Sequence, residues 1–138
     1  SGGGKSTLLA ELATRGQAVV KGPGRRVIAA ARAAGGSGFP WDAADRFADL
    51  AFWMAVADHA TAKADVTFFD RSALDQAAWY ARQGSAPPGD VPHYDKTVFM
   101  APPWPDIHST DPDRRHGFEA GPRARGAVRR AGPWGRGR

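Results

Sequence analysis

The chain of 138 residues contains no cysteine. That absence excludes disulfide scaffolds, thiolate zinc sites and cysteine nucleophiles, and it is compatible with a reducing compartment. Long apolar runs are also missing, because the longest one, residues 50–57, is far too short to cross a bilayer. The first residues show neither the charged region nor the apolar region of a secretory signal. We therefore expect a cytoplasmic protein without a membrane span and with one domain of modest core.

Acidic residues are missing from the last part of the chain. The net charge of +5 divides into −1 over residues 1–120, which carry 13 lysines and arginines against 14 acids, and +6 over residues 121–138. The second range consists mostly of Arg, Gly, Pro and Ala, so we expect a domain at 1–120 and a disordered tail at 121–138. The six arginines of this tail could contact nucleic-acid phosphates, but this function ranks last, because a change of reading frame explains the tail composition equally well.

Lysine is scarce, with 15 arginines against 4 lysines, as in the product of a GC-rich gene. Such a gene translated out of frame yields mainly Arg, Gly, Pro and Ala codons. A frameshift is therefore our preferred origin for the tail, with a natural arginine-rich arm as the alternative. The chain also opens with Ser1, already inside a glycine-rich motif, and we expect it to be a fragment that lacks its natural start.

Helical and strand patterns alternate along the chain, which predicts an α/β fold with a mainly parallel sheet. Ligands of such sheets bind beyond the carboxyl ends of the strands. Apolar spacing predicts helices over residues 6–14, 25–34, 42–64, 72–83 and 113–119, and strands over residues 17–20, 66–69 and 97–100. Glycine- and proline-rich loops are expected at residues 22–24 and 84–93.

The glycine-rich motif at the start is the second half of a phosphate-binding loop, G-x-x-x-x-G-K-[ST]. Its residues are Gly2, Gly3, Gly4, Lys5, Ser6 and Thr7. Consecutive glycines let backbone N–H groups converge on phosphate oxygens, Lys5 supplies a positive charge, and Ser6 is a candidate Mg²⁺ ligand at a helix N-terminus. The alternative is a flexible glycine-rich terminus before an ordinary helix.

A second set of candidate residues follows the apolar run at 66–69. Asp70 stands where a strand-end carboxylate could hold Mg²⁺ or accept a proton from an attacking hydroxyl. Arg71 beside it could bind a phosphate oxygen. The alternative is a strand-end turn with a solvated ion pair. Farther along, Arg114 and Arg115 could close over the phosphates as a lid, with ordinary exposed helix arginines as the alternative.

With these motifs in place, the chain resembles the NadR-like AAA-domain family of P-loop proteins. The matching stretches are GGGKST at 2–7, VVKGPGRR at 19–26, GFPW at 38–41, FFDRSALDQAAWY at 68–80 and VFMAPPWPDIHSTDPDRR at 98–115. GKST and DRS are shared with nucleoside and nucleotide kinases in general, whereas the APPW stretch is more family-specific. The resemblance implies a P-loop NTPase fold, a three-layer α/β/α arrangement. Its first strand would lie before residue 1, so we expect an incomplete sheet.

The resemblance also implies ATP or GTP binding with Mg²⁺. Lys5 and Ser6 would lie on the nucleotide, Asp70 and Arg71 near the metal or the acceptor, and Arg114 or Arg115 in a lid. Related proteins commonly have a glutamate just after the second strand, where this chain has Gly22.

Two functions remain open. One is an Mg²⁺-dependent ATPase or kinase-like enzyme that transfers a phosphoryl group to water or to a small hydroxyl acceptor such as a nucleoside. The other, which Gly22 favours, is a nucleotide-dependent binding switch without useful turnover.

Overall fold

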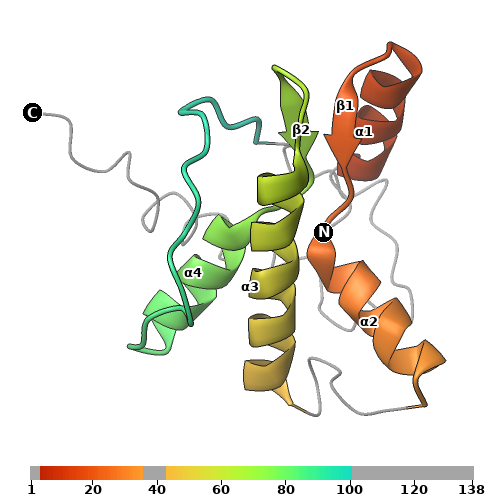
Figure 1. The fold of residues 1–138 in the computed structure, drawn as a ribbon. Helices are drawn as coiled ribbons and strands as arrows, with labels where there is room; N and C mark the ends of the chain where they lie inside the picture. Colours follow the sequence, from red (N-terminus) through yellow and green to blue (C-terminus); the bar gives the residue numbers. More distant parts are fainter. Residues whose placement is uncertain (1–3, 36–42, 101–138) are drawn as a thin grey trace, which may run out of the picture.

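The computed structural model describes residues 4–35 and 43–100. In this part of the chain, helices and strands alternate (Figure 1). The elements are α1 (Lys5–Thr14), β1 (Ala18–Val20), α2 (Pro23–Ala33), α3 (Ala44–Thr61), β2 (Thr67–Phe69) and α4 (Ala73–Arg82). The mixed α/β class predicted from the sequence is confirmed.

The two strands pair in parallel. Ala18 lies opposite Thr67 and Val20 opposite Phe69, and the amide of Asp70 extends the ladder by donating to the carbonyl of Val20 (2.9 Å). Helices α2 and α3 make the connection between the strands. Because parallel strands end at the same edge of a sheet, the residues that follow β1 and β2 come together there.

Helix α3 is the centre of the helical packing. It lies against α2 on one side and α4 on the other, while α1 packs on β1 (Figure 1). Phe52 of α3 is fully buried and forms a core cluster with Ala55 and with Ala73 of α4. Burying a phenylalanine side chain stabilises a fold by about 1.5–3 kcal/mol, so this contact is a principal tie between α3 and α4.

The helix boundaries follow from local chemistry. Helix α2 begins at Pro23, two residues before the predicted start, because proline fits the first helical turn, where its missing N–H costs nothing. Helix α4 begins with a capping box, in which Ser72 and Asp75 satisfy each other's backbone N–H groups. The long helix predicted over residues 42–64 is α3, shortened at both ends.

The strand predicted over residues 97–100 is wrong: the described ranges contain two strands, not three. The side chain of Asp95 accepts a hydrogen bond from the amide of Thr97 (2.7 Å), which turns the backbone locally. Val98 and Phe99 remain exposed, Phe99 by 71%. A β-like composition alone does not supply a neighbouring strand. The irregular stretch and short helix predicted beyond residue 100, and the tail, lie outside the described residues.

No described helix is long and apolar enough to span a membrane.

Candidate functional site

The first part of the site is the start of α1. Gly4 precedes the helix with φ of 66°, a left-handed conformation that favours glycine, and its carbonyl accepts the first helical hydrogen bond, from the amide of Leu8 (3.0 Å). No described side chain caps this N-terminus. Ser6 and Thr7 are exposed in the first turn, and Lys5 is half-buried. The backbone N–H groups and the helix dipole therefore favour an anion here.

The second part is Asp70, which follows β2 directly. Its carboxylate oxygen Oδ1 is buried and has no hydrogen-bond partner among the described residues. A buried carboxylate oxygen without a partner is costly, and a cation or a water molecule would satisfy it. Asp70 is therefore the strongest candidate for a metal ligand in the described part of the chain.

Gly22, after β1, lies against Asp70. A Cβ atom at position 22 would stand 2.7 Å from the backbone oxygen of Asp70 and 3.7 Å from its Oδ2. The first distance is shorter than real Cβ contacts, so the two strand ends meet closely only because residue 22 has no side chain. A residue with a side chain at position 22, glutamate included, does not fit on this backbone unless the strand ends shift.

Asp75 was not singled out by the sequence analysis. Its carboxylate accepts a hydrogen bond from the amide of Ser72 (2.9 Å). The pKa of Asp75 is raised above its ordinary value, chiefly because the carboxyl is desolvated by burial. The negative charge of Asp70 raises this pKa further. The charge of Arg71, the hydrogen bond from Ser72 and the charge of Lys5 act in the opposite direction and lower it. The spacing Ser72-x-x-Asp75 after an apolar run is a capping-box pattern and could have identified this residue.

The charges that shift the pKa of Asp75 come from two separate parts of the chain. Lys5 belongs to α1, whereas Asp70 and Arg71 belong to the turn between β2 and α4, yet all three act on one carboxylate. Coulombic effects of this kind weaken with distance. Two motifs that are far apart in the sequence therefore lie within electrostatic range of one carboxylate, and Lys5, Asp70, Arg71 and Asp75 are called the charge cluster here.

Arg71 occupies an unusual backbone conformation. Its φ of 71° lies in the left-handed region, where it is the one residue other than glycine in the described ranges. Such a conformation costs about 1–3 kcal/mol and persists when the surrounding structure holds it. Its side chain is exposed at the edge where the strands end. The guanidinium can therefore reach a ligand bound at that edge.

The N-terminus of α4 contrasts with that of α1. The amide of Leu74 donates to the hydroxyl oxygen of Ser72 (3.3 Å), and the amide of Asp75 donates to the Ser72 carbonyl (3.0 Å). The amide of Ala73 donates to the hydroxyl oxygen of Tyr94 (3.4 Å). Because side-chain and backbone oxygens already accept from these donors, an anionic ligand is directed to α1 rather than to α4.

The residues present fit Mg²⁺ bound together with phosphates. Magnesium is usually held by one or two carboxylates, waters and substrate phosphates rather than by a complete protein cage. Asp70 offers the carboxylate oxygen, and the exposed Ser6, the second residue of α1, offers a hydroxyl. The described residues contain no cluster of three or more His, Asp or Glu that would hold a metal by itself.

The predicted site residues fall into those that the structure describes and those that lie outside the described ranges. Gly4, Lys5, Ser6 and Thr7 lie at the start of α1, and Asp70 and Arg71 in the turn after β2. The further residues Gly2, Gly3, Arg114 and Arg115 lie outside the described ranges, so their roles stay predictions.

Comparison with known proteins gives one family. The family described as "AAA domain" matches residues 1–131, a range that runs past the predicted domain boundary at residue 120. Neither the curated proteins nor the solved structures gave a significant match. The narrower NadR-like likeness and the position of the boundary stay predictions. Because the match covers nearly the whole chain and its nucleotide-binding motif begins α1, the chain belongs to the AAA-domain family of P-loop proteins.

Proposed function

We propose that this chain binds a nucleoside triphosphate, ATP or GTP, with Mg²⁺ and transfers the γ-phosphoryl group to water or to a small hydroxyl acceptor such as a nucleoside. Two observations carry the proposal: the phosphate-loop motif stands at the uncapped start of α1, and Asp70 Oδ1 is buried without a hydrogen-bond partner at the edge where the strands end. The charges of Lys5, Asp70 and Arg71 all influence the half-buried carboxylate of Asp75, which agrees with their lying in one site. Phosphoryl transfer depends mainly on positioning and on electrostatic stabilisation, and this arrangement supplies both.

Each residue has a role that follows from its position. The N–H groups at the start of α1 and the ammonium of Lys5 bind the β and γ phosphates. Ser6 and Asp70 would hold Mg²⁺, which would neutralise charge on the phosphates. Arg71 binds a γ-phosphate oxygen or the acceptor. The acceptor hydroxyl attacks the γ-phosphorus, the bond to the bridging oxygen breaks, and the nucleoside diphosphate leaves. The hydroxyl proton passes to water, or to Asp70 in the alternative in which Asp70 does not hold the metal.

Parts of the proposal extend beyond the described residues. Arg114 and Arg115 would stabilise charge that develops on the transferred group, as lid residues. A NadR-like specificity and a cytoplasmic location belong to the same proposal, as expectations from sequence.

A nucleotide-dependent switch is the second candidate function. The contact between Gly22 and Asp70 favours it, because it leaves no room for a carboxylate base after β1. In this alternative the same pocket binds nucleotide, and the conformational response rather than turnover is the useful output. The basic tail as a nucleic-acid arm ranks below both.

Calorimetric titration with a non-hydrolysable ATP analogue, with and without Mg²⁺, tests the binding step. We expect Lys5→Ala to weaken binding about tenfold or more, since a hydrogen bond to a charged group contributes about 1.5–3 kcal/mol. Asp70→Asn should reduce mainly the part of the affinity that requires Mg²⁺. Arg15→Ala is the matched control, because it removes an exposed cation beyond the other end of α1 that pairs with Glu11 (2.8 Å).

Unchanged affinity in Lys5→Ala would refute the binding site. A panel of nucleosides with ATP then separates the two functions. Turnover that depends on one acceptor supports a kinase, whereas tight binding without turnover supports the switch.

A further inference from the structure

Residues 84–100 form a strap, so named here, that leaves α4 and passes along α3 to the region of β2 (Figure 1). Gly89 meets the ring of Trp53 on α3, where a Cβ atom would stand only 2.6 Å from the nearest ring carbon. His59 of α3 is hydrogen-bonded through Nε2 to the carbonyl of His93 (2.9 Å). The strap is therefore held against the helices at separate points.

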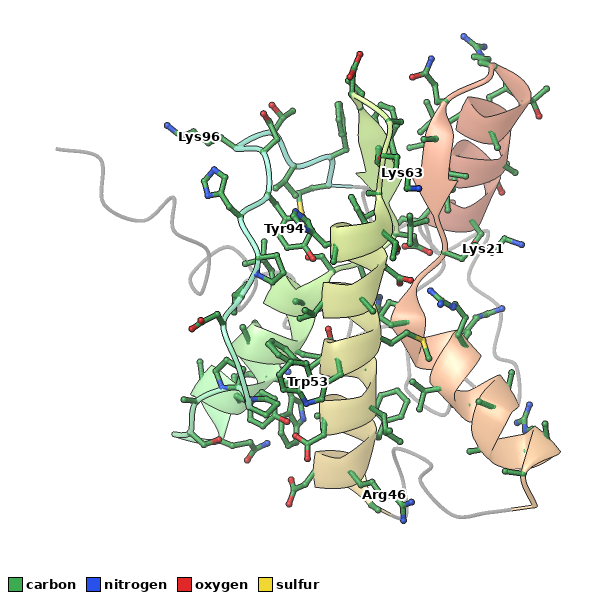
Figure 2. The ribbon with its side chains drawn as sticks, in the orientation of Figure 1. Lys21, Arg46, Trp53, Lys63, Tyr94 and Lys96 are labelled. Carbon is green, nitrogen blue, oxygen red and sulfur yellow. The ribbon has the colours of Figure 1, made fainter. Side chains whose placement is uncertain are left out.

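Tyr94 belongs to the strap and contacts both Phe69 and Ala73, the residues on either side of the turn after β2. Figure 2 shows its side chain beside α3. Its ring packs edge-on against Phe69, with ring centroids 5.6 Å apart, and against His59, at 4.8 Å. Its hydroxyl oxygen accepts the hydrogen bond from the amide of Ala73. Tyr94 also packs against the core cluster formed by Phe52, Ala55 and Ala73.

These contacts bracket the turn that carries Asp70 and Arg71. Phe69 is the last residue of β2 and Ala73 the first residue of α4, so one side chain contacts both ends of the turn. Between them stands Arg71 in its left-handed conformation. A strained turn keeps a single geometry only where its surroundings hold it. The capping box of Ser72 and Asp75 stabilises the end of the turn that leads into α4. Tyr94, which belongs to the strap, contacts both ends of the turn.

We infer that Tyr94 is a positioning residue that holds the turn of Asp70, Arg71 and Ser72 in the geometry required for the Mg²⁺–nucleotide complex. The role in ligand binding rests on the proposed function, whereas the fixing of the turn does not. Tyr94 touches neither phosphate nor metal in this scheme, and it acts through the carboxylate and guanidinium that the turn carries.

A purely structural role for Tyr94 makes a different prediction, and Tyr80 provides the control. The hydroxyl of Tyr80 donates a hydrogen bond to Asp49, which joins α4 to α3 away from the turn. Tyr94→Phe and Tyr80→Phe each remove one tyrosine hydroxyl and keep the ring. Both variants lose some stability, but we expect Tyr94→Phe alone to change the site.

The test uses the full chain and two measurements. The first is amide hydrogen exchange, resolved by residue, in the absence of ligand. In Tyr94→Phe the amides of residues 71–73 should exchange about fivefold faster, the equivalent of one neutral hydrogen bond, after correction for global stability. In Tyr80→Phe they should exchange as in the unmodified chain. Unchanged exchange at residues 71–73 in Tyr94→Phe would overturn the inference.

The second measurement is the affinity for a non-hydrolysable ATP analogue with Mg²⁺ and with EDTA. Mg²⁺ should raise the affinity of Tyr94→Phe for the analogue about fivefold less than it raises the affinity of the unmodified chain. The affinity measured in EDTA should change little, since the substitution displaces the Asp70 carboxylate and not the phosphate loop. Equal losses in both tyrosine variants would show a merely structural role. If the unmodified chain bound no nucleotide, the proposed function would fail, and the exchange rates would still decide whether Tyr94 holds the turn.

Discussion

Replacing Gly22 by alanine tests the close meeting of the two strand ends. The backbone of Gly22, with φ of −55° and ψ of 137°, is open to any residue, so the substitution creates no conformational strain. Its effect comes from the new Cβ atom, 2.7 Å from the Asp70 carbonyl oxygen. That oxygen belongs to the backbone and cannot turn aside as a side chain would. The strand ends must therefore separate.

The expected net loss of stability for Gly22→Ala is about 1–2 kcal/mol. Overpacking of a closely packed site costs about 1–3 kcal/mol. The smaller entropy of the unfolded alanine chain offsets about 0.4–1 kcal/mol of this. Each kcal/mol corresponds to about 4 °C in the unfolding midpoint of a domain of this size, so circular dichroism during heating would detect the loss.

Gly24→Ala is the matched control for Gly22→Ala. A Cβ atom at Gly24 meets only the end of the Phe47 ring, at 3.3 Å, and this half-buried side chain can move slightly. Because alanine is preferred over glycine inside a helix by about 1 kcal/mol, we expect Gly24→Ala to be neutral or stabilising. Equal midpoints for Gly22→Ala and the unmodified chain would refute the close approach on which the site geometry depends.

Three further predictions concern the packing and the ionisable groups. Phe52→Ala should lower the free energy of unfolding by about 3–5 kcal/mol in urea denaturation, because Phe52 is 0% exposed. Arg26 of α2 and Asp58 of α3 form an ion pair at 2.6 Å, in which the Arg26 side chain is 43% exposed. Because solvent and salt screen such a pair, a double-mutant cycle should give a coupling energy of about 1 kcal/mol or less, and this energy should fall with added salt. Burial raises the pKa of both tyrosines, Tyr80 and Tyr94, above 10.0. Absorbance at 295 nm should therefore show tyrosinate forming at higher pH in the folded chain than in urea, and the stability from the neutral phenols should be lost as pH rises through the raised values.

Local patterns in the sequence were sufficient for the helices. The apolar spacing of residues 6–14, 42–64 and 72–83 predicted α1, α3 and α4 closely. Helix formation depends on neighbours three and four residues apart, which the sequence displays directly. Strands are different, because each needs a partner from elsewhere in the chain. The run at 66–69 found its partner in β1, whereas the run at 97–100 forms no strand.

The candidate site likewise has parts that the sequence predicted and parts that it did not. The glycine-rich motif with Lys5 and the strand-end Asp70 were identified from the sequence, because short motifs express a local chemical requirement. The family resemblance implied that both motifs serve one nucleotide site. The contribution of Tyr94 was not predicted, because it depends on the path of the strap.

The sequence by itself determined which residue types are available for phosphate and metal, and which segments are helical. Only the tertiary structure decided that the charges of Lys5 and Arg71 influence one half-buried carboxylate, that of Asp75. It also decided that Gly22 must remain without a side chain, because the neighbour that excludes a Cβ atom, Asp70, arrives from a distant strand. Burial and Coulombic effects depend on distance in space, which residues far apart in sequence acquire only when the parallel strands pair.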